Sequence, residues 1–250
     1  MTRRILIAFV LLAAMAWAHA AQARHYAILS LVGDRLLVVT REMSTGSRLD
    51  RNTREYVRMP DNSLDRSMVV AIDEAIRRAQ PGAATTLLAP KDPSLFAAAD
   101  RRIEGSGNLA EILDAVRPMV AGTDATHLVL VTRQRHAAML RLRDGMVGSG
   151  FLEGLGFYVD HGTFARSVDT NEAERGFIAP FTYVTVSLVD LANGRVLSEE
   201  RVVGSAAYTT PSYNIGNAWL ALTPQQKAER LGEVMKSESA RVIPLLLARS

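Results

Sequence analysis

The chain has 250 residues, of which 48% are hydrophobic, and its 29 Lys and Arg residues exceed its 26 Asp and Glu residues by three. These charges are interspersed and form no basic stripe, so the composition gives no indication of nucleic-acid binding. The absence of Cys excludes disulfides, thiolate nucleophiles and Cys-type metal sites.

The first 23 residues have the pattern of a secretory signal peptide. A short basic start, MTRR, precedes an apolar run over residues 5–18 and two small-residue motifs, AHA and AQA. We expect cleavage after Ala20 or Ala23 and a periplasmic or secreted mature protein of net charge +1, because Arg3 and Arg4 leave with the leader. The apolar run is shorter than the roughly 20 residues that span a bilayer. An uncleaved anchor is the alternative, so membrane contact is allowed but not required.

The first half of the chain predicts two strands and a helix. Residues 25–31 and 35–43 are β-rich and flank a turn, which favours a hairpin. Residues 44–60 are polar and predict a loop or an exposed edge. Apolar residues recur with helical spacing over residues 64–80, and residues 84–89 predict a short buried strand.

The middle of the chain adds a second helix and further strands. Asn108, followed three residues later by Glu111, predicts a capped helix. Residues 126–132 predict a strand that turns into another over residues 136–142. The glycine- and aromatic-rich stretch at about 145–180 predicts an insertion with one strand at 156–159 and a polar loop at 166–175.

The last part predicts a hairpin and a C-terminal helix. Residues 181–191 and 195–207 flank Asn193-Gly194, a dipeptide suited to a tight turn with positive φ. Thr223, Pro224 and Gln226 predict the start of the final helix. We therefore expect one α+β domain over residues 24–250, with a mostly antiparallel or mixed sheet packed against two or three helices. One core should contain Leu113, Val116, Leu128, Leu130, Val184, Val186 and Leu188.

The sequence VSLVDLANGRVLSEE, residues 186–200, resembles strands of periplasmic α/β envelope modules. These are LpoB-like activators of penicillin-binding proteins, CsgG-like assembly proteins and the N-terminal domain of TolB. The chain departs from the lipoprotein members in lacking a lipobox Cys, and from all of them in its Gly-aromatic stretch, residues 150–164. The resemblance implies a non-enzymatic role, binding an envelope protein or a peptidoglycan-associated partner, and transfers no catalytic residue.

A hydrolase is the alternative. Asp160 beside His161, with Ser167 and Asp169 nearby, forms a cluster in which a carboxylate could orient an imidazole and a hydroxyl could act as nucleophile. No G-x-S-x-G elbow surrounds any Ser, and neighbouring strand residues point to opposite faces. The non-enzymatic interpretation is therefore preferred.

Aromatic residues suggest a recognition surface. Those expected to contribute are Phe157, Tyr158, Phe164, Tyr208, Tyr213 and Trp219. Aromatic side chains anchor many interfaces, although the same residues could instead pack the sheet against the last helix.

Neither a metal nor a cofactor is expected from the sequence. The mature histidines, His25, His127, His136 and His161, have no metal-ligand spacing, although His127 and His136 could meet across a hairpin. The glycines at 145–156 match neither phosphate-binding fingerprint. The sequence thus favours a secreted periplasmic binding or accessory protein of the cell envelope.

Overall fold

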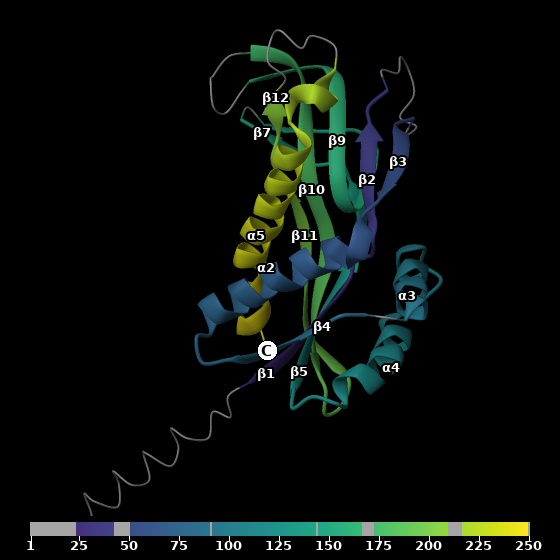
Figure 1. The fold of residues 1–250 in the computed structure, drawn as a ribbon, viewed down its shortest axis with the longest axis vertical. Helices are drawn as coiled ribbons and strands as arrows, with labels where there is room; N and C mark the ends of the chain where they lie inside the picture. Colours follow the sequence, from purple (N-terminus) through teal and green to yellow (C-terminus); the bar gives the residue numbers. More distant parts are fainter. Residues whose placement is uncertain are drawn as a thin grey trace, which may run out of the picture.

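The structure is a computed structural model that describes residues 24–42, 51–90, 92–143, 145–166, 173–209 and 217–249. These residues form an α+β fold in which one large mixed sheet carries helices on both faces (Figure 1). The predicted fold class is therefore confirmed, with four α-helices in the described ranges rather than two or three.

The strands of the main sheet are β1 (His25–Leu31), β2 (Arg35–Thr40), β3 (Thr53–Arg58), β4 (Ala84–Leu88), β5 (His127–Arg133), β6 (Arg135–Ala137), β9 (Phe151–Arg166), β10 (Ala173–Asp190), β11 (Arg195–Ser205) and β12 (Tyr208–Thr209). A separate pair consists of β7 (Leu140–Leu142) and β8 (Gly145–Val147). The helices are α2 (Ser63–Ala79), α3 (Pro93–Ile103), α4 (Leu109–Val120) and α5 (Pro224–Ala248), with short 3-10 turns η1 (Pro60–Asn62) and η3 (Ala218–Ala221).

The long strand β10 joins the two halves of the sheet. On one side it pairs first with β9, through Tyr183 opposite Gly154, and then with β5, from Val184 opposite Arg133 onward. On its other side it pairs with β11 and β12. Strands β9 and β5 therefore lie end to end along β10, and the molecule is elongated in the same direction (Figure 1).

Three parallel strands form one end of the sheet, in the order β4-β1-β5. The chain passes from β1 through β2 and β3 to α2, which leads into β4. It then passes through α3 and α4 to β5. The carboxyl ends of the three strands consequently meet at one place, between the two halves of the sheet.

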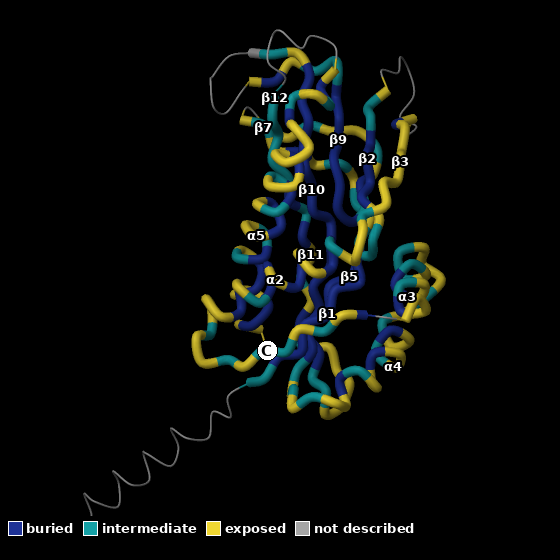
Figure 2. Tube along the Cα trace, in the orientation of Figure 1, coloured by how far each residue is buried: buried dark blue, intermediate teal, exposed yellow. Residues whose placement is uncertain are grey.

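The core has three parts, because the sheet is buried on both faces. Helices α2 and α5 cover one face along its length, where they pack on Ile28, Val131 and Val186, among others. Helices α3 and α4 cover the opposite face over β1 and β5, and the segment containing β6, β7 and β8 covers that face over β9. The buried trace accordingly follows the strands through the middle of the molecule (Figure 2).

Local sequence signals account for the helix boundaries. Asn108 accepts a hydrogen bond from the backbone N–H of Glu111 at 3.0 Å, as the capping pattern predicts. Thr223 and Gln226 form the predicted reciprocal capping box at the start of α5. The turn between β10 and β11 is also confirmed, with Gly194 at φ +69°.

The predicted hairpin of the first two strands is wrong. Strand β1 pairs with β4 and β5, whereas β2 pairs with β3 and β9. Both strands are buried on both faces, which is typical of strands in the sheet interior and carries little information on the partner. Residues 53–58, within the segment predicted as a loop or an exposed edge, form the exposed edge strand β3.

The segment at about 145–180 contains more regular structure than the sequence predicts. Strand β9 pairs with β2 and β10, and β10 begins within the same segment. In place of an insertion, this segment therefore supplies interior strands of the main sheet. Glycines allow this close packing: a Cβ on Gly156 would lie 1.8 Å from the carbonyl oxygen of Leu37.

The predicted single core is divided between the two faces. Val184, Val186 and Leu188 face α2 and α5, whereas Leu128 and Leu130 face the opposite way and pack with Leu113 and Val116 of α4. The reason is the two-residue period of strands, which sends neighbouring residues to opposite faces. The predicted signal peptide, residues 1–23, lies outside the described residues. Of the helices in the described ranges, none has the length and hydrophobicity needed to cross a membrane.

Candidate functional site

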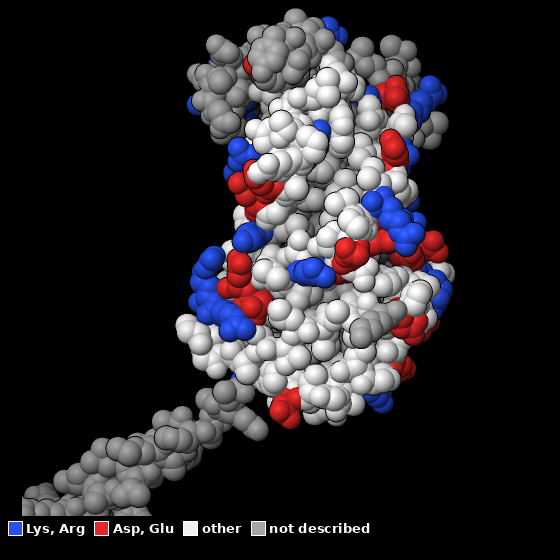
Figure 3. Space-filling view, viewed as in Figure 1, with Lys and Arg blue, Asp and Glu red and all other residues white. Residues whose placement is uncertain are grey.

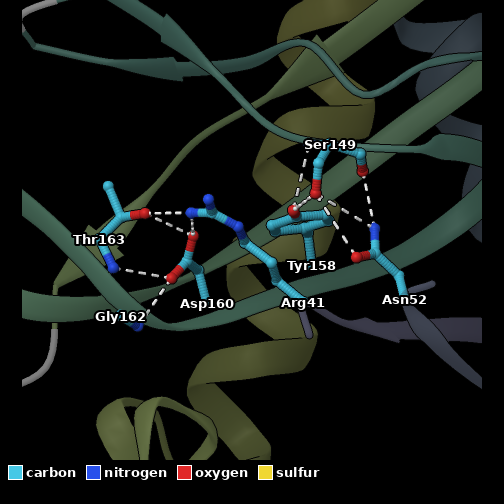
Figure 4. Close-up of polar contacts among 7 residues, drawn as sticks. All are labelled: Arg41, Asn52, Ser149, Tyr158, Asp160, Gly162 and Thr163. Carbon is cyan, nitrogen blue, oxygen red and sulfur yellow. Dashed lines mark hydrogen bonds and ion pairs between the residues drawn. The ribbon is translucent and has the colours of Figure 1, made fainter. Parts of the chain in front are cut away.

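The predicted catalytic carboxylate, Asp160, lies in a saturated polar network on β9 (Figure 4). Its Oδ2 accepts hydrogen bonds from Arg41 and from Thr163 Oγ1, each at 2.7 Å. Its Oδ1 accepts from the backbone N–H groups of Gly162 and Thr163, each at 2.8 Å. Burial opposes ionisation of Asp160, but these donors outweigh burial and lower the pKa of its carboxyl group.

His161 does not share this network. Its Nδ1 accepts a hydrogen bond from the backbone N–H of Ala218 at 3.1 Å. The structure thus gives Asp160 and His161 different partners, and Ser167 and Asp169 lie outside the described residues. The hydrogen bonds of Asp160 and His161 connect β9 to Arg41, which follows β2, and to Ala218 of η3. Their role is therefore structural.

The predicted aromatic residues do not form one surface. Phe157 and Tyr158 are buried, and the hydroxyl of Tyr158 is hydrogen-bonded to Ser149, which is itself bound by Asn52 (Figure 4). Phe164 is 73% exposed. Trp219 and Tyr208 are half-buried beside α5, and Tyr213 lies outside the described residues.

Two cationic side chains of α5 contact the half-buried aromatic rings. The ammonium group of Lys227 lies 3.9 Å from the ring centre of Trp219, and the guanidinium group of Arg230 lies 4.9 Å from that of Tyr208. Both rings also pack against the core beneath α5. These two aromatic residues therefore anchor the last helix to the sheet.

The histidines are separated as well. His127 pairs with Tyr26 and Asp190 in the sheet, and His136 pairs with Leu152. The side chain of His25 is hydrogen-bonded to Thr86. Within the described ranges, no three His, Asp or Glu side chains are grouped so that they could hold a metal ion.

A pocket of about 460 Å³ lies at the carboxyl ends of the parallel strands. We call it the strand-end pocket. Strand β1 continues into β2 within the same sheet, whereas its neighbour β4 leads to α3 on the face opposite α2. The chain therefore diverges after these two adjacent strands, and the strand-end pocket lies where it diverges.

Each of the surrounding elements contributes to the pocket. Its lining comprises Val32, Gly33, Asp34 and Arg35 after β1, Pro90, Pro93, Phe96 and Asp100 after β4, Arg133 at the end of β5, Arg58 at the end of β3, and Asn62 before α2. The walls are thus both apolar and charged.

Cations and anions alternate around the pocket. Arg58 binds Asp34 at 2.7 Å, and Arg35 lies 3.5 Å from Asp100. Arg133 contacts Asp100 and binds Glu153 at 3.1 Å. Both signs of charge are visible where β3 and the start of α2 approach α3 (Figure 3). The pocket is therefore polar without a strong excess of either charge.

Arg133 combines deep burial with incomplete hydrogen bonding. Its side chain is 10% exposed, and its Nε has no hydrogen-bond partner among the described residues. A buried donor without an acceptor costs about 1–3 kcal/mol. Arg133 therefore lies at the pocket with one of its donors unsatisfied among the described residues.

Asp65, in the first turn of α2, carries a second buried polar atom without a hydrogen-bond partner in the described ranges. Its Oδ1 accepts from the backbone N–H groups of Val32 at 2.9 Å and Gly33 at 3.4 Å, whereas Oδ2 is buried without a partner in the described ranges. Burial raises the pKa of Asp65 to about 6, and its hydrogen bonds only partly oppose the shift. Asp65 lines a smaller hollow of about 180 Å³ that shares Asn62 and Pro90 with the strand-end pocket.

The backbone between the two hollows has an unusual conformation. Asp61 and Asn62 have φ values of +56° and +49°, and the Asn62 side chain makes no capping hydrogen bond to α2. Asp and Asn tolerate this left-handed region better than other non-glycine residues. The segment consequently brings Asn62 to the border of both hollows.

The sequence alone does not indicate this site. Its signals were Gly33-Asp34 directly after one strand, two prolines after another, and an aspartate on the predicted buried face of a helix. None of these is distinctive until the parallel order of β4, β1 and β5 is known.

No protein-family model matches the chain, and no curated protein matches it. Among solved structures it is similar to protein XCC0632 of Xanthomonas campestris, with 6% identity and a TM-score of 0.37 over 90% of this chain and 84% of that one. It is also similar to a putative neuraminyllactose-binding hemagglutinin homologue of Helicobacter pylori, with 6% identity and a TM-score of 0.37 over 92% and 84%. A third similar structure is PelC of Paraburkholderia phytofirmans, with 14% identity and a TM-score of 0.33 over 90% of each chain. None of these similarities is close enough to assign a family or a function.

Proposed function

We propose that the chain is a secreted, periplasmic, non-enzymatic binding or accessory protein of the bacterial cell envelope, and that the strand-end pocket is its ligand site. The observation that carries this proposal is the position of the pocket. It lies where β1, β4 and β5 end together, and its lining combines an apolar wall with charged groups, among them Arg133, whose buried Nε has no hydrogen-bond partner among the described residues. A hollow with an apolar wall and a few convergent polar groups is the usual form of a small-molecule site.

The lining favours a small ligand that carries both charges. Arg35 and Arg58 could bind a carboxylate, while Asp34 and Asp100 could bind an ammonium group. Pro93 and Phe96 supply an apolar wall for the remainder of such a molecule. Amino acids and short peptides have this chemistry, and a peptidoglycan-associated ligand would share it.

The hydrogen bonds that Asp160 already accepts support a binding role over a catalytic one. A triad carboxylate must accept a hydrogen bond from its histidine, but all four donors on Asp160 come from Arg41, Gly162 and Thr163. No contact of Asp160 therefore favours the hydrolase. The leader-type N-terminus supports a location outside the cytoplasm.

A thermal-shift screen tests the proposed site. Amino acids, dipeptides and tripeptides, with sugars and inorganic phosphate as comparison compounds, are added to wild-type protein and to Arg35→Ala. Arg77→Ala is the matched control, because Arg77 is equally a surface ion-pair residue but lies on α2 outside the pocket. A ligand at about 100 times its Kd stabilises the folded state by about 2.7 kcal/mol.

We expect a zwitterionic compound to raise the Tm of wild type and Arg77→Ala, and to raise that of Arg35→Ala much less. Equal shifts in all three proteins would place the ligand elsewhere. The absence of a shift with every compound would contradict the proposal.

A further inference from the structure

Strand β3 forms one edge of the main sheet, next to β2. Among the described residues it pairs with β2 alone, and all six of its residues are exposed (Figure 2). They include Tyr56 at 48% and Val57 at 39% exposure. Alternate residues of such a strand direct their backbone N–H and C=O groups outward, where another strand can bind them.

One face of β3 is basic. Its register with β2 places Arg54, Tyr56 and Arg58 on the face that also carries Arg35. The guanidinium group of Arg35 lies 5.4 Å from the ring centre of Tyr56, and Arg54 donates to the carbonyl oxygens of Asn52 and Phe151. The strand thus presents two cations with an aromatic ring between them, and Arg58 is also ion-paired with Asp34 at 2.7 Å.

These charges disfavour the two most central registers in which β3 could pair with a second copy of itself. If two copies of β3 paired about a two-fold axis normal to the sheet, the same face of each copy would point in the same direction. Two residues opposite each other would then both have even numbers or both have odd numbers, because side chains alternate between the faces of a strand. The register centred on Tyr56 then puts Arg54 opposite Arg58, and the register centred on Glu55 puts Glu55 opposite itself. Like charges directly opposite each other are destabilising.

We propose that β3 is a docking site for an extended acidic segment of another protein, which adds to the sheet as an extra strand. Acidic side chains at alternate positions would lie beside Arg54 and Arg58, with an apolar side chain between them beside Tyr56. The added strand binds through main-chain hydrogen bonds, and charge complementarity selects its sequence. The exposed edge of β3 shares Arg35 and Arg58 with the strand-end pocket, but strand addition does not require that the pocket binds a ligand.

A pair of synthetic peptides tests the proposal. In the first, Glu residues alternate with Thr around a central Val. The second has the same composition with its Glu residues consecutive. Binding to the whole protein is measured by fluorescence anisotropy, and hydrogen exchange of the backbone amides locates the contact. The variants are Arg54→Glu and, as matched control, Arg201→Glu, which makes the same charge change at an exposed position of β11.

The alternating peptide is expected to bind wild type and Arg201→Glu alike, and to bind Arg54→Glu about tenfold more weakly or worse. It should slow exchange at residues 53–58 of the wild-type protein, a result that needs no variant. Three results would overturn the proposal: no binding of the alternating peptide, equal binding of both peptides, or protection confined to other strands. Equal binding would indicate a general polyanion surface in place of strand addition.

Discussion

At the scale of single residues, two buried aspartates have opposite electrostatic environments. Asp160 is surrounded by donors, which keep its carboxylate ionised, whereas Asp65 has backbone donors on one oxygen and none in the described ranges on the other. The sequence marked Asp160 as a candidate because it adjoins His161, and it gave no reason to single out Asp65. Asp160 and His161 are adjacent on a strand, which does not bring their side chains together. Asp65 is buried against the distant turn at Val32 and Gly33, and this burial raises its pKa.

Asp65→Asn should remove a pH dependence of stability. Because burial raises the folded-state pKa of Asp65 to about 6, the native state holds a proton that the unfolded chain, at an ordinary pKa of 3.8, releases. Stability contributed by this group is full below about pH 4 and is lost as the pH rises through about 6, by about 2–3 kcal/mol in total. The Asn oxygen can still accept from Val32 and Gly33.

Urea unfolding of wild type and Asp65→Asn between pH 4 and pH 7 measures this effect. We expect the stability of wild type relative to the variant to fall across that interval. Parallel pH profiles of the two proteins would show that Asp65 has an ordinary pKa.

At the scale of elements, local signals are enough for helices and tight turns but not for strand partners. The caps at Asn108 and Thr223 and the turn at Asn193-Gly194 depend on neighbouring residues, so the sequence predicted them. The partners of β1 and β2 lie far along the chain, and strands buried on both faces lack the alternation that would indicate an exposed side.

The turn between β10 and β11 allows a test of backbone strain alone. Gly194 has φ +69°, and a Cβ there would meet no atom within 4 Å. Gly194→Val should therefore destabilise the fold through its backbone conformation, by about 1–3 kcal/mol. Gly194→Asn should cost less, because Asn enters the left-handed region more readily. Thermal unfolding of the two variants makes the comparison, and equal shifts would refute the strain argument.

Strand β5 should be among the least tolerant elements. Leu130 is fully buried between β1, β10 and the helices α3 and α4. Leu130→Ala should lower the free energy of unfolding by about 2–5 kcal/mol, the usual range for a buried large-to-small change. Denaturant unfolding measures it, and a loss below about 1 kcal/mol would indicate a surface-like site.

At the scale of the whole molecule, the order β4-β1-β5 determines where a ligand site can form. The sequence predicted the α+β class correctly, since that depends on the kinds of element present. It predicted neither the parallel order nor the two-sided core, which depend on pairings between distant segments. The strand-end pocket brings together Arg35, Pro93 and Arg133, which are far apart in sequence, and could not be anticipated without those pairings.

The proposed location can be checked on the intact protein. We expect the mature chain to begin at Ala21 or Arg24, because both predicted cleavage sites follow small residues at the −3 and −1 positions. Mass spectrometry of protein isolated from the periplasm of a bacterial host determines the start. Recovery of the chain from Met1 in that fraction would contradict cleavage.

The most direct test of the central claim is amide chemical-shift mapping of the ligand identified by the thermal-shift screen. If the strand-end pocket binds it, the largest shifts should fall on Gly33, Asp34, Phe96 and Arg133, which come from separate elements that meet at this pocket. Shifts confined to another region, such as β12 or η3, would contradict the assignment of this pocket as the binding site.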